Sequence, residues 1–234
     1  MRAVERFSTG FERLDKSLKG GIPLNSMILL MGKAGTGKSL FCYHIMNEFL
    51  KKGKNCLFIA TRDKPERLIK DIEDIGFDIS DDIKEKRLIF IDCYSPTAAE
   101  EKGKFKIVDI LDLNGLFITI QKTLKRLKPP VLFVFDSLTD LLLRNERNSC
   151  LKFLKALIGL IKEKGSIGIF ILQEDVHDQK TIASIEYLCD GTIRLHVKNK
   201  KRMVEIKRMK GVFGSFTFEL KHKDGLILKE FFRY

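Results

Sequence analysis

The sequence lacks the features that mark membrane, secreted and disulfide-stabilised proteins. Its apolar runs are short, with 167–172 typical of the longest, whereas a membrane span needs roughly 18 apolar residues. The first residues contain no apolar segment of the secretory type, so we expect no signal peptide. Five cysteines form no Cys-x-x-Cys pair, which argues against a disulfide framework and a zinc site. We therefore expect a cytoplasmic protein whose cysteines are small buried side chains.

The chain does contain a regular alternation of strand and helix signals, which changes character after Gly191. Before that point, short apolar runs predict buried parallel strands with helices between them. Beyond it, apolar residues recur with a period of two and predict antiparallel strands, with an Asp-Gly turn inside 223–225. The predicted parallel strands are 27–31, 56–60, 88–91, 131–135 and 167–172; the helices are 38–51, 65–75, 115–127 and 149–162; the antiparallel strands are 192–197, 202–207, 216–220 and 226–229.

These signals predict the fold class α/β: a mainly parallel central sheet flanked by helices, with an antiparallel C-terminal edge. A chain of 234 residues is long enough to bury a core without disulfides, and we expect one domain over 1–234. The stretch 95–113 contains charges, a proline and a glycine, and we interpret it as a mobile loop.

The strongest motif lies between the first predicted strand and its helix. Residues 32–39 match G-x-x-x-x-G-K-[ST] at every fixed position. Glycines let such a loop curl so that its backbone N–H groups, together with the helix N-terminus, surround phosphate oxygens. Lys38 would reach the β- and γ-phosphates of a nucleotide, and the Ser39 hydroxyl would bind Mg²⁺. The predicted nucleotide-binding residues are Gly32, Lys33, Ala34, Gly35, Thr36, Gly37, Lys38, Ser39 and Leu40.

A second signal is Asp136, which follows the apolar run 131–135. A buried parallel strand delivers its last carboxylate to the carboxyl edge of the sheet, beside the phosphate loop. Asp136 is therefore predicted to hold Mg²⁺ together with Ser39, directly or through water. An acid at a strand end can also serve simply as a helix cap.

With these residues in view, the sequence resembles the KaiC-like and RadA-like ATPases of the RecA superfamily. The resemblance is carried by segments spread from Thr9 to Gly211. It implies a RecA-type core that binds ATP and Mg²⁺ and assembles as a homo-oligomer, a ring or filament with nucleotide between subunits. The matching segments are T-G-F-E-R-L-D at 9–15, G-G-I-P at 20–23, F-D-S-L-T at 135–139, C-D-G-T-I-R-L at 189–195 and R-M-K-G at 208–211.

The sequence departs from the family pattern after the second predicted strand. KaiC-like enzymes carry adjacent glutamates there, in a pattern like T-x-E-E-x-P, and the first is assigned to orienting the attacking water. Here that position is Arg62, and Asp63 keeps an acid at the second position. A positioned base contributes roughly 10²–10⁴-fold in rate. Asp63 either takes that role or only favours the N-terminus of the helix near Pro65.

Three further candidates follow from the resemblance. Gln173 ends a strand where RecA-like proteins place a residue that senses the γ-phosphate. Arg208 and Lys210 match a basic pair that family members direct at the neighbouring subunit's γ-phosphate, in exchanged order. Arg208 is the better candidate for a finger acting in trans, because lysine cannot make a bidentate contact. The bland interpretation is a charged face of an exposed strand.

The net charge of +12 raises the question of nucleic acid. Residues 194–223 hold ten lysines and arginines against two glutamates, a net of +8. In RecA-like recombinases, DNA is held by loops after the fourth and fifth strands, here 138–149 and 174–180. Neither is a basic groove with stacking aromatics. The charge is better explained, in part, by the triphosphate contacts between subunits that the resemblance implies, and surface lysines account for the remainder.

We therefore expect a slow Mg²⁺-dependent ATPase that assembles through its ATP sites. The first alternative is a non-hydrolysing, ATP-dependent regulatory scaffold in which Arg62 disables the water site. The second is a DNA-associated recombination accessory protein. No sequence feature identifies a client protein, and none points to a membrane.

Overall fold

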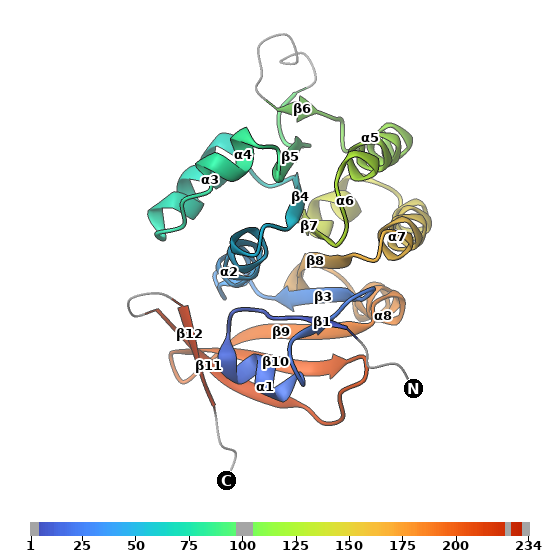
Figure 1. Ribbon diagram of the computed structural model, residues 1–234. Helices are drawn as coiled ribbons and strands as arrows, with labels where there is room; N and C mark the ends of the chain where they lie inside the picture. Colours follow the sequence, from blue (N-terminus) through green and yellow to red (C-terminus); the bar gives the residue numbers. More distant parts are fainter. Residues whose placement is uncertain (1–4, 97–104, 223–225, 231–234) are drawn as a thin grey trace.

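The computed structural model describes residues 5–96, 105–222 and 226–230. Helices and strands alternate along most of the chain (Figure 1). In chain order the elements are β1 (Arg6–Phe7), α1 (Glu12–Ser17), β2 (Ile22–Pro23), β3 (Met27–Gly32), α2 (Lys38–Lys51), β4 (Asn55–Ala60), α3 (Pro65–Asp74), α4 (Ser80–Lys84), β5 (Leu88–Asp92), β6 (Lys106–Ile107), α5 (Leu113–Arg126), β7 (Val131–Asp136), α6 (Leu138–Arg144), α7 (Arg147–Glu163), β8 (Ile167–Gln173), the 3₁₀ turn η2 (Glu174–Val176), α8 (Gln179–Leu188), β9 (Gly191–Lys198), β10 (Lys201–Met209), β11 (Phe216–His222) and β12 (Leu226–Glu230).

Within the described residues, the main sheet has ten strands in the order β12-β11-β10-β9-β3-β8-β7-β4-β5-β6. Pairing is parallel from β9 through to β6, whereas β10, β11 and β12 add to β9 in antiparallel fashion. The strand that leads into the phosphate loop, β3, lies between β8 and β9. The predicted fold class is therefore confirmed, including the antiparallel C-terminal edge.

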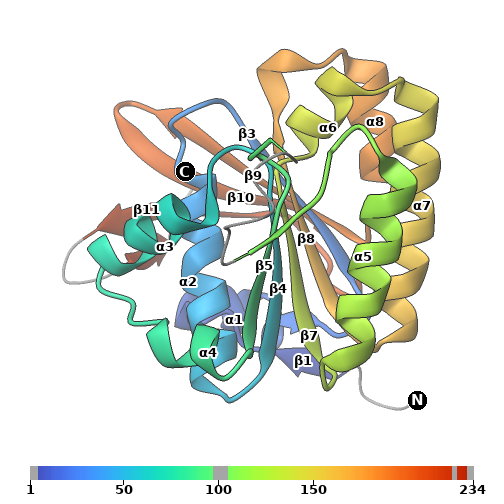
Figure 2. The same ribbon diagram turned by 90° about the horizontal axis from the view of Figure 1, so that it is seen from above.

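Helices cover both faces of the parallel part (Figure 2), with α2, α3 and α4 on one side and α5, α7 and α8 on the other. Successive residues of β3 alternate between the two resulting cores. Ile28 and Leu30 belong to the core on the α2 side, and Met27, Leu29 and Met31 belong to the other. A strand buried on both faces has to be apolar at every position, which is why these strands appear in the sequence as continuous runs rather than alternating ones.

The predicted strands and helices are all present, with bounds shifted by at most two residues. The turn between β9 and β10 is made by Asn199 and Lys200, both with positive φ, as a two-residue hairpin turn requires. The Asp-Gly turn predicted inside 223–225 lies outside the described residues. All five cysteines are buried and unbridged, as expected.

Some segments interpreted as loops are in fact ordered elements. Residues 138–149 form α6 and the beginning of α7, because Leu138 and Leu141 lie one turn apart and are buried beneath the helix. The end of 174–180 begins α8, where Asp178 caps the helix by accepting the N–H of Thr181 at 2.8 Å. The prediction of a mobile loop over 95–113 is wrong for its second half, because Lys106 and Ile107 form a strand that pairs with β5, and α5 begins at residue 113. Residues 97–104 of this stretch lie outside the described part of the chain.

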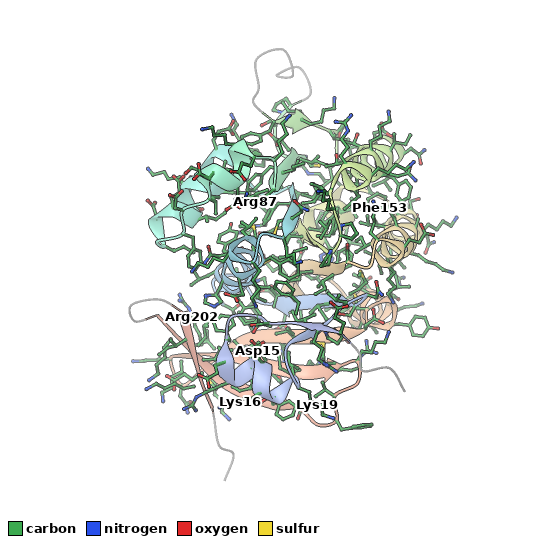
Figure 3. The ribbon with its side chains drawn as sticks, viewed as in Figure 1. Asp15, Lys16, Lys19, Arg87, Phe153 and Arg202 are labelled. Carbon is green, nitrogen blue, oxygen red and sulfur yellow. The ribbon has the colours of Figure 1, made fainter. Side chains whose placement is uncertain are left out.

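The N-terminal motif T-G-F-E-R-L-D has a structural role. Asp15, on α1 (Figure 3), accepts the backbone N–H and the hydroxyl of Thr9 at 2.8 and 2.7 Å, and the Ser8 hydroxyl at 2.7 Å. Thr9 is fully buried. Gly10 follows with φ of +81°, and a Cβ there would lie 2.9 Å from Nε2 of His44. The motif therefore fastens the first segment of the chain to α2.

Candidate nucleotide site

The predicted phosphate loop joins β3 to α2. Its first residue, Gly32, lies so close to β9 that a Cβ would stand 2.2 Å from the carbonyl oxygen of Leu195. Its last glycine, Gly37, has φ of +95° and begins α2 at Lys38. Glycine is needed at both positions, at the first for space and at the second for backbone conformation. The loop therefore directs the N-terminus of a long helix toward the carboxyl edge of the sheet.

Lys38 lies over this loop. Its side chain is almost fully buried, and its Nζ donates to the carbonyl oxygens of Gly32 and Lys33, each at 2.8 Å. The hydroxyl of Thr36 also donates to the Lys33 carbonyl, at 2.8 Å. Burial lowers the pKa of Lys38, and the nearby positive charge of Arg62 lowers it further. The ammonium group is thus partly desolvated and positioned where phosphates would be expected.

Ser39 and Asp136, the predicted metal pair, are in contact. The Ser39 hydroxyl donates to Oδ2 of Asp136 at 3.1 Å. Asp136 is 3% exposed, and burial raises its pKa, while its other oxygen, Oδ1, has no hydrogen-bond partner. A hydroxyl beside a buried carboxylate with an unpaired oxygen is a suitable ligand set for Mg²⁺. The residues present therefore fit the metal that the loop motif implies.

Arg62 stands at the end of β4, next to β7 in the sheet. One of its terminal nitrogens, Nη1, lies 3.7 Å from Oδ1 of Asp136, which is within ion-pair range and too long for a hydrogen bond. The neighbouring Thr61 N–H donates to the Asp136 carbonyl at 2.9 Å. The residue that replaces the family's glutamate therefore points its charge at the predicted metal ligand.

The Asp63 carboxylate contacts residues at the start of α3. Its carboxylate accepts the N–H of Lys64 at 2.9 Å and pairs with Arg67, one turn along α3, at 3.0 Å. These contacts are those expected if Asp63 only stabilises the N-terminus of α3. The role of Asp63 as a base stays a prediction.

The remaining predicted residues lie at two places. Gln173 pairs with Gly32 in the sheet register, and its N–H donates to the Thr139 hydroxyl at 2.9 Å, so it stands beside the phosphate loop.

Arg208 is engaged within its own chain, where Nη2 donates to the carbonyls of Glu186 and Cys189 at 2.6 and 2.7 Å. Lys210 is exposed. Their action in trans stays a prediction.

A buried polar network beside Asp136 was not predicted. The Asp140 carboxylate accepts the hydroxyls of Thr61 and Ser137, each at 2.8 Å, and the Ser137 N–H donates to the Thr61 hydroxyl at 2.6 Å. The network ties the end of β4 to the beginning of α6. In the sequence, the only trace of this network is Asp140, four residues after Asp136. Its contact with Thr61 could not be predicted, because it depends on β4 lying next to β7.

One basic side chain of the C-terminal strands lies near the phosphate loop, and several others form ion pairs. A Cβ on Gly37 would lie 3.7 Å from Cδ of Arg202, so this arginine, labelled in Figure 3, adjoins the phosphate loop. Arg194 makes a two-pronged ion pair with Glu174, at 2.8 and 2.9 Å. Three further ion pairs offset positive charge on these strands: Lys201–Glu219, Lys207–Glu186 and Lys221–Glu219.

In the described residues no helix is long and apolar enough to cross a membrane. No cluster of three or more histidine, cysteine or acidic side chains there could hold a metal ion.

The loop, the Ser39–Asp136 pair and the parallel strands that converge on them define a P-loop nucleotide-binding protein of the α/β type. Residues 7–215 match the family described as "ATPase: KaiC", and the chain belongs to this family, in the RecA superfamily. A KaiC-like protein of Pyrococcus horikoshii has the same fold, with a TM-score of 0.78 over 97% of this chain and 99% of that one, at 21% identity.

Relatives by sequence agree with this assignment. A UPF0273 protein of Thermotoga maritima is 26% identical over 238 residues, covering 96% of each chain. The circadian clock protein KaiC3 of Synechocystis is 25% identical over 96% of this chain, which corresponds to 46% of KaiC3. This chain is thus similar to a little under half of that clock protein.

Proposed function

We propose that residues 1–234 form a single KaiC-like domain that binds ATP with Mg²⁺ and hydrolyses it slowly. The observation that carries the proposal is the contact of Ser39 with Asp136 at the end of the phosphate loop. Lys38 and the loop N–H groups would bind the phosphates, and Ser39 and Asp136 the metal. Mg²⁺, when bound, neutralises charge on the triphosphate. ATP and ADP are the proposed ligands and the cytoplasm the proposed location.

Around this centre we assign the remaining roles as follows. Asp63 acts as the base, and Gln173 senses the γ-phosphate from its place beside Gly32. Arg208 and Lys210 act on the nucleotide of a neighbouring subunit in a homo-oligomeric ring or filament. A cation supplied in trans can be worth roughly 10³–10⁵ in rate, which is consistent with slow turnover by an unassembled chain.

Two measurements test the proposal. Purified protein should release phosphate from ATP in a Mg²⁺-dependent manner and above the level of a Lys38→Ala control. Light scattering coupled to size exclusion should show a larger particle with Mg-ATP than without nucleotide. Phosphate release equal to that of Lys38→Ala would remove hydrolysis, and an unchanged particle size would remove assembly.

A second candidate is an ATP-loaded regulatory scaffold that does not hydrolyse. It is favoured by Arg62, which stands where the family has its first glutamate and faces Asp136 at 3.7 Å. An Arg62→Glu substitution separates the candidates. A large gain in turnover supports the scaffold, whereas unchanged turnover means that Arg62 does not limit hydrolysis.

DNA association receives no support from the site. The two segments expected to hold DNA are largely helical, and much of the basic charge on β9, β10 and β11 is paired with glutamates. Salt-sensitive DNA binding, tighter than that of an unrelated basic protein, would restore this alternative.

A further inference from the structure

The carboxylate of Asp136 has two different sides. Oδ2 accepts the Ser39 hydroxyl at 3.1 Å, whereas Oδ1 makes no hydrogen bond and faces Nη1 of Arg62 at 3.7 Å. The Asp136 side chain is 3% exposed and that of Arg62 is 53% exposed. The guanidinium of Arg62 therefore lies near the surface of the site, and the carboxylate of Asp136 lies buried beneath it.

Asp136 needs a counter-charge, because an unpaired buried carboxylate is costly. Lys38 does not supply one through contact, since its Nζ is bound to the carbonyls of Gly32 and Lys33. Asp140, whose charge raises the pKa of Asp136, adds a second acid nearby. In the described part of the chain, Arg62 makes the single ion pair of Asp136.

Arg62, which follows β4, and Arg67, on α3, each face an acidic partner. Arg67 pairs with Asp63 at 3.0 Å, while Arg62 is directed at Asp136. A glutamate at position 62 would instead add a further negative charge near Asp136 and Asp140. These carboxylates would repel nucleotide phosphates, and a divalent cation would offset that repulsion.

We propose that Arg62 is a built-in cation of the nucleotide site, which neutralises Asp136 and allows the loop to bind ATP and ADP without a divalent metal. The inference rests on the proposed nucleotide binding and goes beyond it, since it concerns the metal-free ligand. Mg²⁺, when bound, would supply the same counter-charge, and the half-exposed Arg62 side chain, at 3.7 Å from Asp136, would then be free to turn away. Arg62 and Mg²⁺ therefore satisfy the same carboxylate in turn.

The test compares ATP and ADP affinities, measured by titration calorimetry in EDTA and in excess Mg²⁺. In the wild type, removing Mg²⁺ should weaken binding by less than about tenfold. In Arg62→Gln, affinity in EDTA should fall by a further roughly 10–100-fold, as expected when a charge-assisted contact is lost. Affinity in Mg²⁺ should change by less than about threefold. Arg67→Gln, the matched control on α3, should behave as the wild type.

A double-mutant cycle with Asp136→Asn identifies the partner of Arg62. Once the carboxylate charge is removed, adding Arg62→Gln should change metal-free affinity by less than about threefold. A full loss when Arg62→Gln is added to the Asp136→Asn variant would mean that Arg62 binds phosphate directly, which overturns the neutralising role. Equal metal dependence in wild type and Arg62→Gln overturns it as well. In both cases tight Mg-ATP binding leaves the proposed function intact, whereas no binding in either buffer overturns both proposals.

Discussion

Asp190, in the turn before β9, accepts the backbone N–H of Met27 at 2.9 Å and so fixes the start of β3. Its carboxylate also pairs with Lys162 of α7 at 2.8 Å. One side chain thereby joins the strand before the phosphate loop, a helix and the turn that leads into β9. This gives the Asp of the C-D-G-T-I-R-L segment a structural role at the start of β3, at the opposite end of that strand from the phosphate loop.

We expect Asp190→Ala to reduce the free energy of unfolding by about 1–3 kcal/mol, because it leaves a partly buried N–H unsatisfied. Asp190→Asn keeps an acceptor oxygen and should cost about half as much. Urea denaturation of both variants measures the difference. Equal losses would mean that the ion pair with Lys162, rather than the contact with Met27, carries the effect.

Gly32→Ala should be strongly destabilising, by about 3 kcal/mol or more, since its methyl group would stand 2.2 Å from the backbone oxygen of Leu195. Gly35→Ala is the matched control. Gly35 also has a positive φ, but nothing lies within 4 Å of a Cβ there, so only the conformational cost of about 1–2 kcal/mol applies. Chemical denaturation should separate the two, and similar losses would contradict the packing explanation.

Lys38→Ala should weaken ATP binding roughly 10–100-fold through loss of a charged donor to phosphate. Lys33→Ala is the control, because the predicted part of Lys33 in binding belongs to its backbone, which alanine keeps, and its side chain is exposed. Its affinity should remain within about threefold of the wild type. Calorimetric titration with Mg-ATP measures both, and a similar loss in the two variants would point to general loop charge.

Arg208 can be tested for two roles at once. Arg208→Ala removes donors to the carbonyls of Glu186 and Cys189 at the end of α8, so stability should fall by about 1 kcal/mol. Lys210→Ala should leave stability unchanged. If the pair acts in trans, both variants lose ATPase activity of the assembled protein. Activity loss confined to Arg208→Ala, in proportion to its stability loss, would leave only the helix-end role.

Acidification should destabilise the protein partly through His44. Its ring stacks on Phe11 with centroids 3.9 Å apart, and burial lowers its pKa. The folded state therefore holds His44 neutral, and the unfolded state takes up the proton first, so stability falls as the pH drops below about 6.5. The melting temperature difference between about pH 7.5 and about pH 5.5 should be smaller in His44→Gln than in the wild type. An undiminished difference would assign the acid sensitivity to other groups.

The sequence was sufficient for the fold and for the phosphate loop because both rest on local patterns. Continuous apolar runs reveal strands buried on two faces, and the loop motif is contiguous. Arg62 was recognised only as a departure, because its contact with Asp136 depends on β4 lying beside β7. The Thr61–Ser137–Asp140 network and the place of Arg202 depend on the same kind of long-range pairing. Helix α6 was missed because a DNA-binding loop was expected there by family analogy.

The position of β3 determines when its part of the sheet can form during synthesis of the chain. Its two neighbours, β8 and β9, are encoded in the last third of the chain, and Gly32 is packed against Leu195 of β9. A nascent chain that has just exposed its phosphate loop therefore lacks both strands that flank β3 in the folded sheet. If the loop binds nucleotide as proposed, binding becomes possible only near the end of synthesis, and fragments that stop before β9 should not bind ATP.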